Sequence, residues 1–239
     1  MSAGGRVRAV VGVIGELFIT AGLVISLFAL YVLFWTGVET SSAQDALEDE
    51  FDSLQEPVPV AAADDSGESS ESSESGDSAE GTPVDPSDVE AVSDPLPGSA
   101  YARMRIPRLG ESWEWIVVQG VDMLDLRRGP GRYIESAHPG EIGNFAVAGH
   151  RATYGEPFAY LDRIRVGDEI LVERAGVEHR YVVTDWFITT PDDVDVLAPV
   201  PSQPGVEATE AFITLTTCHP RFGSTERLIV HGVLVGEEA

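Results

Sequence analysis

The chain has 239 residues, of which 43% are hydrophobic, and its 40 acidic and 15 basic side chains give a formal net charge of −25. Nothing in this composition supports a nucleic acid as a partner. A single cysteine, Cys218, excludes an internal disulfide.

The first predicted element is a membrane anchor at residues 9–38, where Glu16 is the only formally charged residue. The uninterrupted apolar part, residues 17–38, would form a helix about 33 Å long at 1.5 Å per residue, enough to cross a bilayer. A cleavable signal peptide is the alternative, but its apolar core is usually only about 7–15 residues long. Two arginines before the helix place residues 1–8 in the cytoplasm, so a single-pass protein would hold its remaining chain outside the cell.

A linker is predicted next, at residues 39–98. This segment carries 18 of the acidic residues and no basic one. Its centre, residues 64–88, is a tract of Ser, Glu, Gly, Asp and Pro with almost no apolar side chain to bury. Such a composition does not repay the entropy of ordering, so we predict a disordered acidic tether.

Residues 99–239 are long enough for one domain. Turn residues separate its predicted strands, and one helical turn is expected within residues 122–133 and a short helix at 156–164. The predicted strands lie within residues 101–110, 113–121, 144–150, 169–174, 179–190, 211–218 and 227–235. This pattern is typical of a mostly antiparallel barrel or sandwich with one or two short helices.

Three side chains at strand ends suggest chemistry. Cys218 ends one predicted strand, His150 ends another, and Arg227 opens the last. A thiolate can attack a carbonyl, an imidazole can move protons, and a guanidinium can stabilise an oxyanion. Taken singly, each has a structural alternative: a small buried hydrophobe, a surface histidine and a salt bridge at the barrel rim. Together they predict acyl transfer through a cysteine.

Two motifs resemble those of a known family. "TLTTC", at residues 214–218, is followed nine residues later by the arginine of "ERLIV", as in the TLxTC signature and downstream arginine of the sortases. "NFAVAGHRATYGEPF", at residues 144–158, resembles their histidine segment. "RIPRLG", "RRGPGRY" and "GHRATYGEPFAYL" look closest to the class E housekeeping sortases of actinobacteria. The resemblance covers residues 99–236, and the anchor and tether match the usual layout of the family.

The resemblance implies the eight-stranded sortase β-barrel and a role for each motif residue. Cys218 would be the nucleophile, His150 the general acid and base, and Arg227 the stabiliser of the transition state. Thr216 and Thr217 would shape the pocket beside the thiol.

The implied activity is that of a membrane-anchored cysteine transpeptidase that uses no cofactor. It would cut surface proteins between Thr and Gly of a C-terminal LAxTG or LPxTG motif and hold them as a thioester. An amine of a cell-wall precursor would then attack the thioester and become joined to the surface protein by an amide bond. Class E resemblance implies a preference for alanine, whose extra N–H needs an acceptor when buried. The hydroxyls of Tyr133 and Tyr154 are the candidates, with Tyr133 favoured.

Several alternatives stay open from the sequence. A secreted cysteine peptidase of the papain-like type would place its cysteine before its histidine and on a helix. A pilus-polymerising sortase has an Asp-Pro-aromatic lid, and residues 94–96, Asp-Pro-Leu, lack the aromatic. A surface-binding barrel without activity is a third. No spaced cluster predicts a metal site, and we interpret the aspartates at 192–195 as a solvated loop rather than a calcium site.

Overall fold

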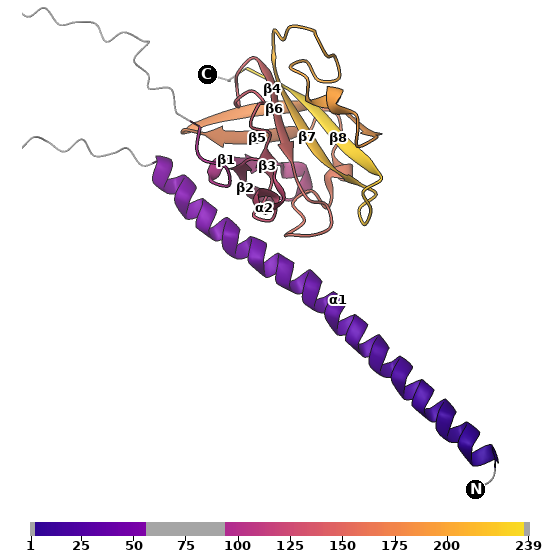
Figure 1. Cartoon of the computed structure of the whole chain (residues 1–239). Coiled ribbons are helices and arrows are strands. Elements are labelled where there is room, and N and C mark those ends of the chain that lie inside the picture. The colour runs from indigo at the N-terminus through magenta and orange to yellow at the C-terminus, as the bar shows by residue number, and fades with distance from the viewer. Residues whose placement is uncertain (1–2, 56–93, 237–239) are drawn as a thin grey trace, which may run out of the picture.

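The computed structural model describes residues 3–55 and 94–236. A long helix, α1 (Ala3–Gln55), lies beside a closed barrel of eight strands (Figure 1). The eight-stranded barrel predicted from the resemblance is therefore confirmed. Within α1, the stretch Val11–Tyr31 is long and apolar enough to cross a membrane and is exposed along its whole length.

The barrel strands are short, as the turn residues predicted. They are β1 (Ala100–Arg105), β2 (Glu114–Gln119), β3 (Gly131–Arg132), β4 (Gly143–Ala148), β5 (Glu169–Arg174), β6 (Val177–Thr189), β7 (Ala211–His219) and β8 (Glu226–Leu234). The only α-helix between them is α2 (Met123–Leu126), and the 3-10 turns are η2 (Pro107–Leu109), η3 (Leu161–Arg163) and η4 (Val194–Leu197). The helix expected at residues 156–164 is thus reduced to the single turn η3, although its Phe158, Leu161 and Ile164 are buried as the spacing predicted.

Around the barrel the strands follow the order β1-β2-β3-β4-β7-β8-β6-β5. The pairs β2–β3 and β4–β7 are parallel, and the other neighbours are antiparallel. Parallel pairing of β4 with β7 puts Ala148 opposite Thr216, so the carboxyl ends of both strands lie at one end of the barrel. His150 follows the first strand and Cys218 lies near the end of the second.

The barrel interior is apolar, and its walls alternate between inward and outward side chains. All six residues of β4 are buried. A loop covers its outer face: the Asn144 side chain donates hydrogen bonds to the carbonyls of Val196 (3.2 Å) and Ala198 (3.0 Å). The strand that leads to His150 is therefore packed on both sides.

Helix α1 corrects the prediction that an unstructured linker begins at residue 39. It continues without a break to Gln55, and its last turns pack on the barrel. Leu47 and Phe51, four residues apart and therefore on one face of the helix, are 0% and 3% exposed. They contact the apolar cluster made by Ala100, Ile116 and Val118. Composition averaged over residues 39–98 concealed this stripe, and residues 56–93 lie outside the described part of the chain.

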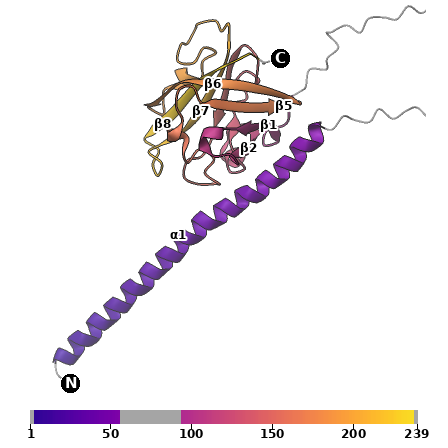
Figure 2. The ribbon, with the colours of Figure 1, turned by 180° about the vertical axis from the view of Figure 1, so that it is seen from behind.

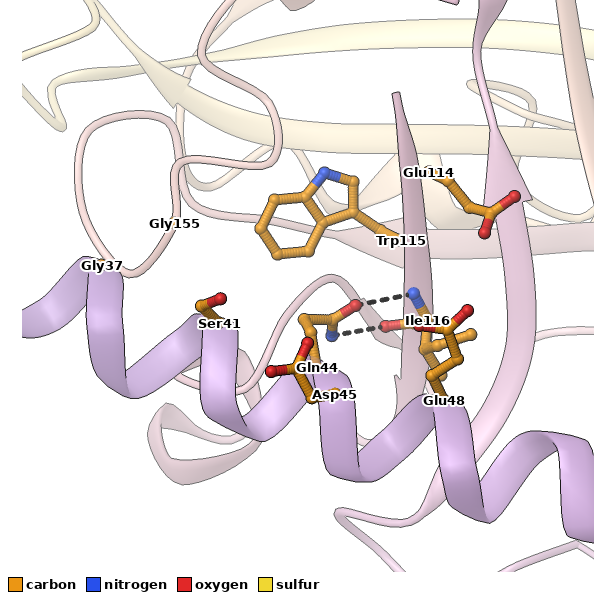
Figure 3. A pocket seen from close by; sticks show the side chains of 9 residues that line it. All are labelled: Gly37, Ser41, Gln44, Asp45, Glu48, Glu114, Trp115, Ile116 and Gly155. Carbon is orange, nitrogen blue, oxygen red and sulfur yellow. Dashed lines mark hydrogen bonds between the residues drawn. The ribbon is translucent and has the colours of Figure 1, made fainter. Parts of the chain in front are cut away.

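Gln44 fastens α1 to the open edge of β2 (Figure 3). Its side-chain oxygen accepts from the backbone N–H of Ile116 (2.8 Å), and its amide nitrogen donates to the Ile116 carbonyl (3.0 Å). The same nitrogen donates to the carbonyl of Arg128 (2.8 Å). The Gln44 amide thus bonds both the N–H and the carbonyl of Ile116, as the backbone of a neighbouring strand would. Two residues later, at Val118, strand β3 takes over this pairing with β2.

The folded domain begins earlier than the predicted boundary at residue 99. Arg132 is 2% exposed inside the barrel wall, and its guanidinium donates to the Asp94 carboxylate at 3.0 Å. Arg174 reaches the same carboxylate at 3.4 Å. A buried guanidinium needs such a partner, so Asp94 is part of the domain.

Candidate active site

A pocket of about 210 Å³ opens at the end of the barrel where β4 and β7 both finish. Its lining consists of Val121, Leu126, Tyr133, Ala148, Gly149, His150, Thr216, Thr217, Cys218 and Arg227. The structure therefore brings together six of the seven residues that the sequence singled out. The seventh, Tyr154, is not among the lining residues.

Strand pairing sets Cys218 beside Arg227, because the two are direct partners in the antiparallel β7–β8 ladder. The Arg227 guanidinium donates to the carbonyls of Ser224 (3.1 Å) and Glu226 (3.0 Å), which fix its place at the pocket wall. Among the described residues, no carboxylate lies within ion-pair distance of it. A fixed cation beside the thiol is suited to binding a carbonyl oxygen of a substrate.

The turn that carries His150 is clamped to β7. The backbone N–H of Gly149 donates to the Thr216 carbonyl (3.1 Å), and the Thr217 hydroxyl donates to the Gly149 carbonyl (2.7 Å). A Cβ at position 149 would lie 2.6 Å from the Phe158 ring, so only glycine fits there. These contacts bring His150 to the same pocket as Cys218.

The surroundings of His150 favour its neutral form. Burial lowers its pKa below the ordinary value of 6.5, and the nearby positive charge of Arg127 lowers it further. The Tyr154 ring lies against the imidazole with 5.1 Å between centroids, and Nε2 has no hydrogen-bond partner within the described residues. A neutral imidazole with a free nitrogen can take a proton from a thiol.

The two candidate tyrosines have different positions. The Tyr133 hydroxyl lies in the pocket, 3.4 Å from the hydroxyl of Thr216. Tyr154 instead flanks His150, and the Arg127 guanidinium lies 5.3 Å from the centre of its ring. The Tyr133 hydroxyl is therefore part of the pocket, whereas Tyr154 packs against the His150 ring.

Arg151 is a residue of the site that sequence reasoning missed. It is 4% exposed, and its guanidinium contacts the Cys218 carbonyl (3.5 Å), His219 Nδ1 (2.8 Å) and the Asp162 carboxylate (3.3 Å). It ties the histidine turn to the end of the cysteine strand. Its place directly after His150 in "GHR" was the only signal, and a charged residue in a turn is normally exposed.

Across residues 3–55 and 94–236, no three His, Cys, Asp or Glu side chains are grouped to hold a metal ion. The pocket itself offers one thiol and one imidazole, a pair suited to acyl transfer.

Comparison with known proteins agrees with this geometry. Residues 104–235 match the family described as the sortase domain. Sortase SrtE1 of Streptomyces coelicolor is 34% identical over 236 residues, which cover 94% of this chain and 57% of that protein. SrtE2 of the same organism is 32% identical over 246 residues, covering 98% and 86%. The solved structure of sortase E from Streptomyces avermitilis is 42% identical with a TM-score of 0.54, covering 59% of this chain and 91% of that one.

Proposed function

Because the chain belongs to the sortase family of cysteine transpeptidases and has class E sortases among its relatives, we propose that it joins surface proteins to the cell wall. It would recognise a C-terminal motif of the Leu-Ala-x-Thr-Gly or Leu-Pro-x-Thr-Gly type and transfer the threonine carbonyl to an amine of a cell-wall precursor. The observation that carries the proposal is the single pocket that Cys218, His150 and Arg227 line together.

In the first step His150 takes the proton of the Cys218 thiol, and the sulfur attacks the threonine carbonyl. Arg227, the direct strand partner of the cysteine, stabilises the negative oxygen that develops. The bond between threonine and glycine then breaks, and His150 gives its proton to the departing glycine nitrogen. The substrate remains attached to Cys218 as a thioester.

In the second step the acceptor amine attacks the thioester carbonyl and loses a proton to His150. The carbon–sulfur bond breaks, the sulfur regains a proton, and a new amide is released. In each step the imidazole must be neutral at the start, so that it can first accept a proton as a base and then return it as an acid. The lowered pKa of His150, caused by burial and by Arg127, supports that role.

Tyr133 would set the preference at the second motif position. An alanine there presents a backbone N–H that proline lacks, and this donor needs an acceptor once it is buried. The Tyr133 hydroxyl lies in the pocket beside Thr216 and offers such an oxygen. Thr216 and Thr217 shape the adjoining wall, while Tyr154 supports the imidazole.

We place the protein in the cell membrane, with the first residues in the cytoplasm and the barrel outside the cell. The apolar stretch Val11–Tyr31 supports this topology, together with the two arginines that precede it. The partners outside the cell would be surface proteins with a sorting motif and the amine of a cell-wall precursor.

Two of the alternatives lose support in the structure. A papain-like peptidase carries its cysteine on a helix, whereas Cys218 lies in β7. A lid at residues 94–96, as in pilus-polymerising sortases, would cover the pocket. Asp94 instead pairs with Arg132 and Arg174, and none of these lines the cysteine pocket.

The test is product analysis with the full chain in detergent, a Leu-Ala-x-Thr-Gly peptide and an excess of amine. We expect the threonine carboxyl to be joined to the amine, and cleavage to stop in Cys218→Ala. In Tyr133→Phe, the advantage of the alanine peptide over the proline peptide in kcat/KM should fall by about fivefold, equivalent to about 1 kcal/mol. Cleavage by Cys218→Ala would contradict the proposal, and an unchanged ratio would remove Tyr133 from motif selection.

A further inference from the structure

Helix α1 runs without a break from the predicted membrane span to the barrel. The apolar stretch ends at Tyr31, and among the side chains that the structure describes after it, Thr40 is buried against the barrel, with its hydroxyl donating to the Arg127 carbonyl at 2.8 Å. Thr40 lies nine helical steps beyond Tyr31, a rise of about 13 Å. The headgroup layer on one side of a bilayer is itself about 5–8 Å thick. If the stretch spans the membrane, as the proposed function requires, the barrel stands close above the headgroups.

The contacts along α1 show which end of the barrel faces the membrane. Thr40, nearest the span, lies against the turn that follows His150: a Cβ on Gly155 would be 2.9 Å from the Thr40 methyl group. Asp52, farther from the span, pairs with Arg103 of β1 at 2.7 Å. The catalytic end of the barrel is therefore the end nearer to the membrane.

The loop between β7 and β8, residues 220–225, extends farthest in that direction. Figures 1 and 2, seen from opposite sides, both show this yellow loop reaching from the barrel toward the N-terminal half of α1. It is attached to the histidine turn, because Arg221 forms an ion pair with Glu156 at 2.5 Å. Its position relative to the helix is thus fixed through the same turn that Thr40 contacts.

This loop exposes Phe222, which at 84% is the most exposed large apolar side chain among those described. Residues 220–225 include no acidic side chain to repel anionic headgroups. Aromatic side chains on protein surfaces favour the boundary between headgroups and acyl chains. Cys218 and Arg227, on either side of the loop, both line the catalytic pocket.

We propose that the β7–β8 loop is a membrane-contact surface, with Phe222 inserted among the lipid headgroups and the catalytic pocket opening beside the bilayer. The inference rests on the proposed topology. A substrate that keeps its own membrane segment, or an amine carried on a lipid, would then meet the thiol without leaving the membrane surface.

The lone cysteine makes the insertion directly measurable. In full-length Cys218→Ser protein, Phe222→Cys would carry the only thiol, to which a nitroxide spin label is attached before reconstitution in lipid nanodiscs. The matched control is Ile142→Cys, since Ile142 is 67% exposed and precedes β4 at the opposite end of the barrel from His150. Collision with oxygen, which concentrates in lipid, is compared with collision with a water-soluble nickel chelate.

We expect the label at 222 to show several-fold higher oxygen-to-nickel accessibility than the label at 142. Equal, water-like values at both positions would overturn the proposal. Because both proteins lack the nucleophile, the result does not depend on catalysis. An inserted label, together with wild-type protein that transfers no peptide, would reject the proposed function and leave the membrane surface standing.

A second comparison links the surface to turnover. Phe222→Ser in the otherwise natural chain should transfer a nanodisc-held substrate at least threefold more slowly than Ile142→Ser does. Its rate with soluble peptides should equal that of the control, since Phe222 does not line the pocket. Equal rates of the two variants on the membrane-held substrate would count against the loop as the contact surface.

Discussion

At the scale of single residues, the charge state of His150 decides whether the pocket can move protons in both directions. Burial is the larger cause of its lowered pKa, and Arg127 is the second. Arg127 is itself held in place, because its carbonyl accepts from Thr40 and its guanidinium lies over the Tyr154 ring. Helix α1 therefore contacts the arginine whose charge acts on the His150 imidazole.

Arg127→Gln should raise the pKa of His150, because a positive charge that disfavours protonation is removed while burial remains. The imidazole would then gain its proton at a higher pH, and the acidic limb of the kcat/KM profile would move upward with it. An NMR titration of the histidine side chains measures the change. Arg163→Gln removes an equal charge on η3 and should leave His150 unchanged. A pKa that does not rise in Arg127→Gln would remove this arginine from the account.

His231 is a second buried histidine, and it does not line the pocket that contains Cys218. It is 8% exposed, with its ring nitrogens 3.0 Å from the Thr214 hydroxyl and 3.2 Å from that of Ser202. Burial lowers its pKa to about 4, partly offset by the carboxylates of Asp185 and Asp193. Between pH 6.5 and 4 the unfolded chain therefore binds a proton at this residue that the folded chain does not.

The free energy of unfolding should accordingly fall as the pH drops through this window and be unaffected by His231 above pH 6.5. The full contribution is about 3 kcal/mol, at about 1.4 kcal/mol for each unit of pKa difference. Urea unfolding of the full chain at pH 7 and pH 4.5, followed by tryptophan fluorescence, gives the difference. His231→Asn should lose less stability between the two pH values than the natural chain. An identical loss in both would show that carboxylates alone account for it.

At the scale of elements, the docked end of α1 belongs to the catalytic domain. It covers Ile116 and Val118 with Leu47 and Phe51, and Gln44 satisfies the edge of β2. A pocket of about 400 Å³ remains between helix and strand (Figure 3), so the interface is anchored at Gln44 and at the apolar cluster rather than along its whole length. The sequence alone placed the domain at residues 99–239, which would define a fragment that begins near residue 99. The structure indicates that such a fragment would expose this cluster and lose Asp94.

Leu47→Ala should destabilise the contact between α1 and the barrel by about 2–5 kcal/mol, because the side chain is fully buried and leaves a cavity. Hydrogen exchange of the β2 amides in the full chain measures this directly, since Ile116 N–H donates to Gln44. Leu54→Ala is the matched control, because Leu54 lies on the same helix and is 65% exposed. Equal protection of β2 in the two variants would mean that α1 does not stabilise the barrel edge.

Sequence patterns predicted the strands well, because alternation and turn residues are local signals. The nine-residue spacing between Cys218 and Arg227 matches their pairing across a hairpin. The parallel pairing of β4 with β7 could not be predicted from the residues, since it joins segments far apart in the chain. The docking of α1 was also missed, because an acidic average hid an apolar stripe. The burial of Arg151 and the influence of Arg127 on His150 depend on tertiary contacts that no local pattern contains.

At the scale of the whole molecule, a continuous series of contacts joins the apolar stretch of α1 to the pocket that contains Cys218. The apolar stretch of α1 leads to Thr40, Thr40 contacts the turn after His150, and that turn is ion-paired with the loop between Cys218 and Arg227. We expect the catalytic end to be held at a set height above the bilayer. A flexible acidic tether, which is the layout predicted from composition, would instead have let the distance between the barrel and the bilayer vary.

The covalent intermediate at Cys218 is the central requirement of the proposed function. The most direct measurement is the intact mass of the full chain after rapid mixing with a sorting-motif peptide in the absence of amine, followed by acid quench. We expect an added mass equal to that of the peptide ending in threonine less one water, as a thioester requires, located on Cys218 and discharged when an amine is supplied. It should be absent from Cys218→Ala and strongly reduced in His150→Ala. A peptide cleaved without any adduct on Cys218, or an adduct that no amine discharges, would contradict the account.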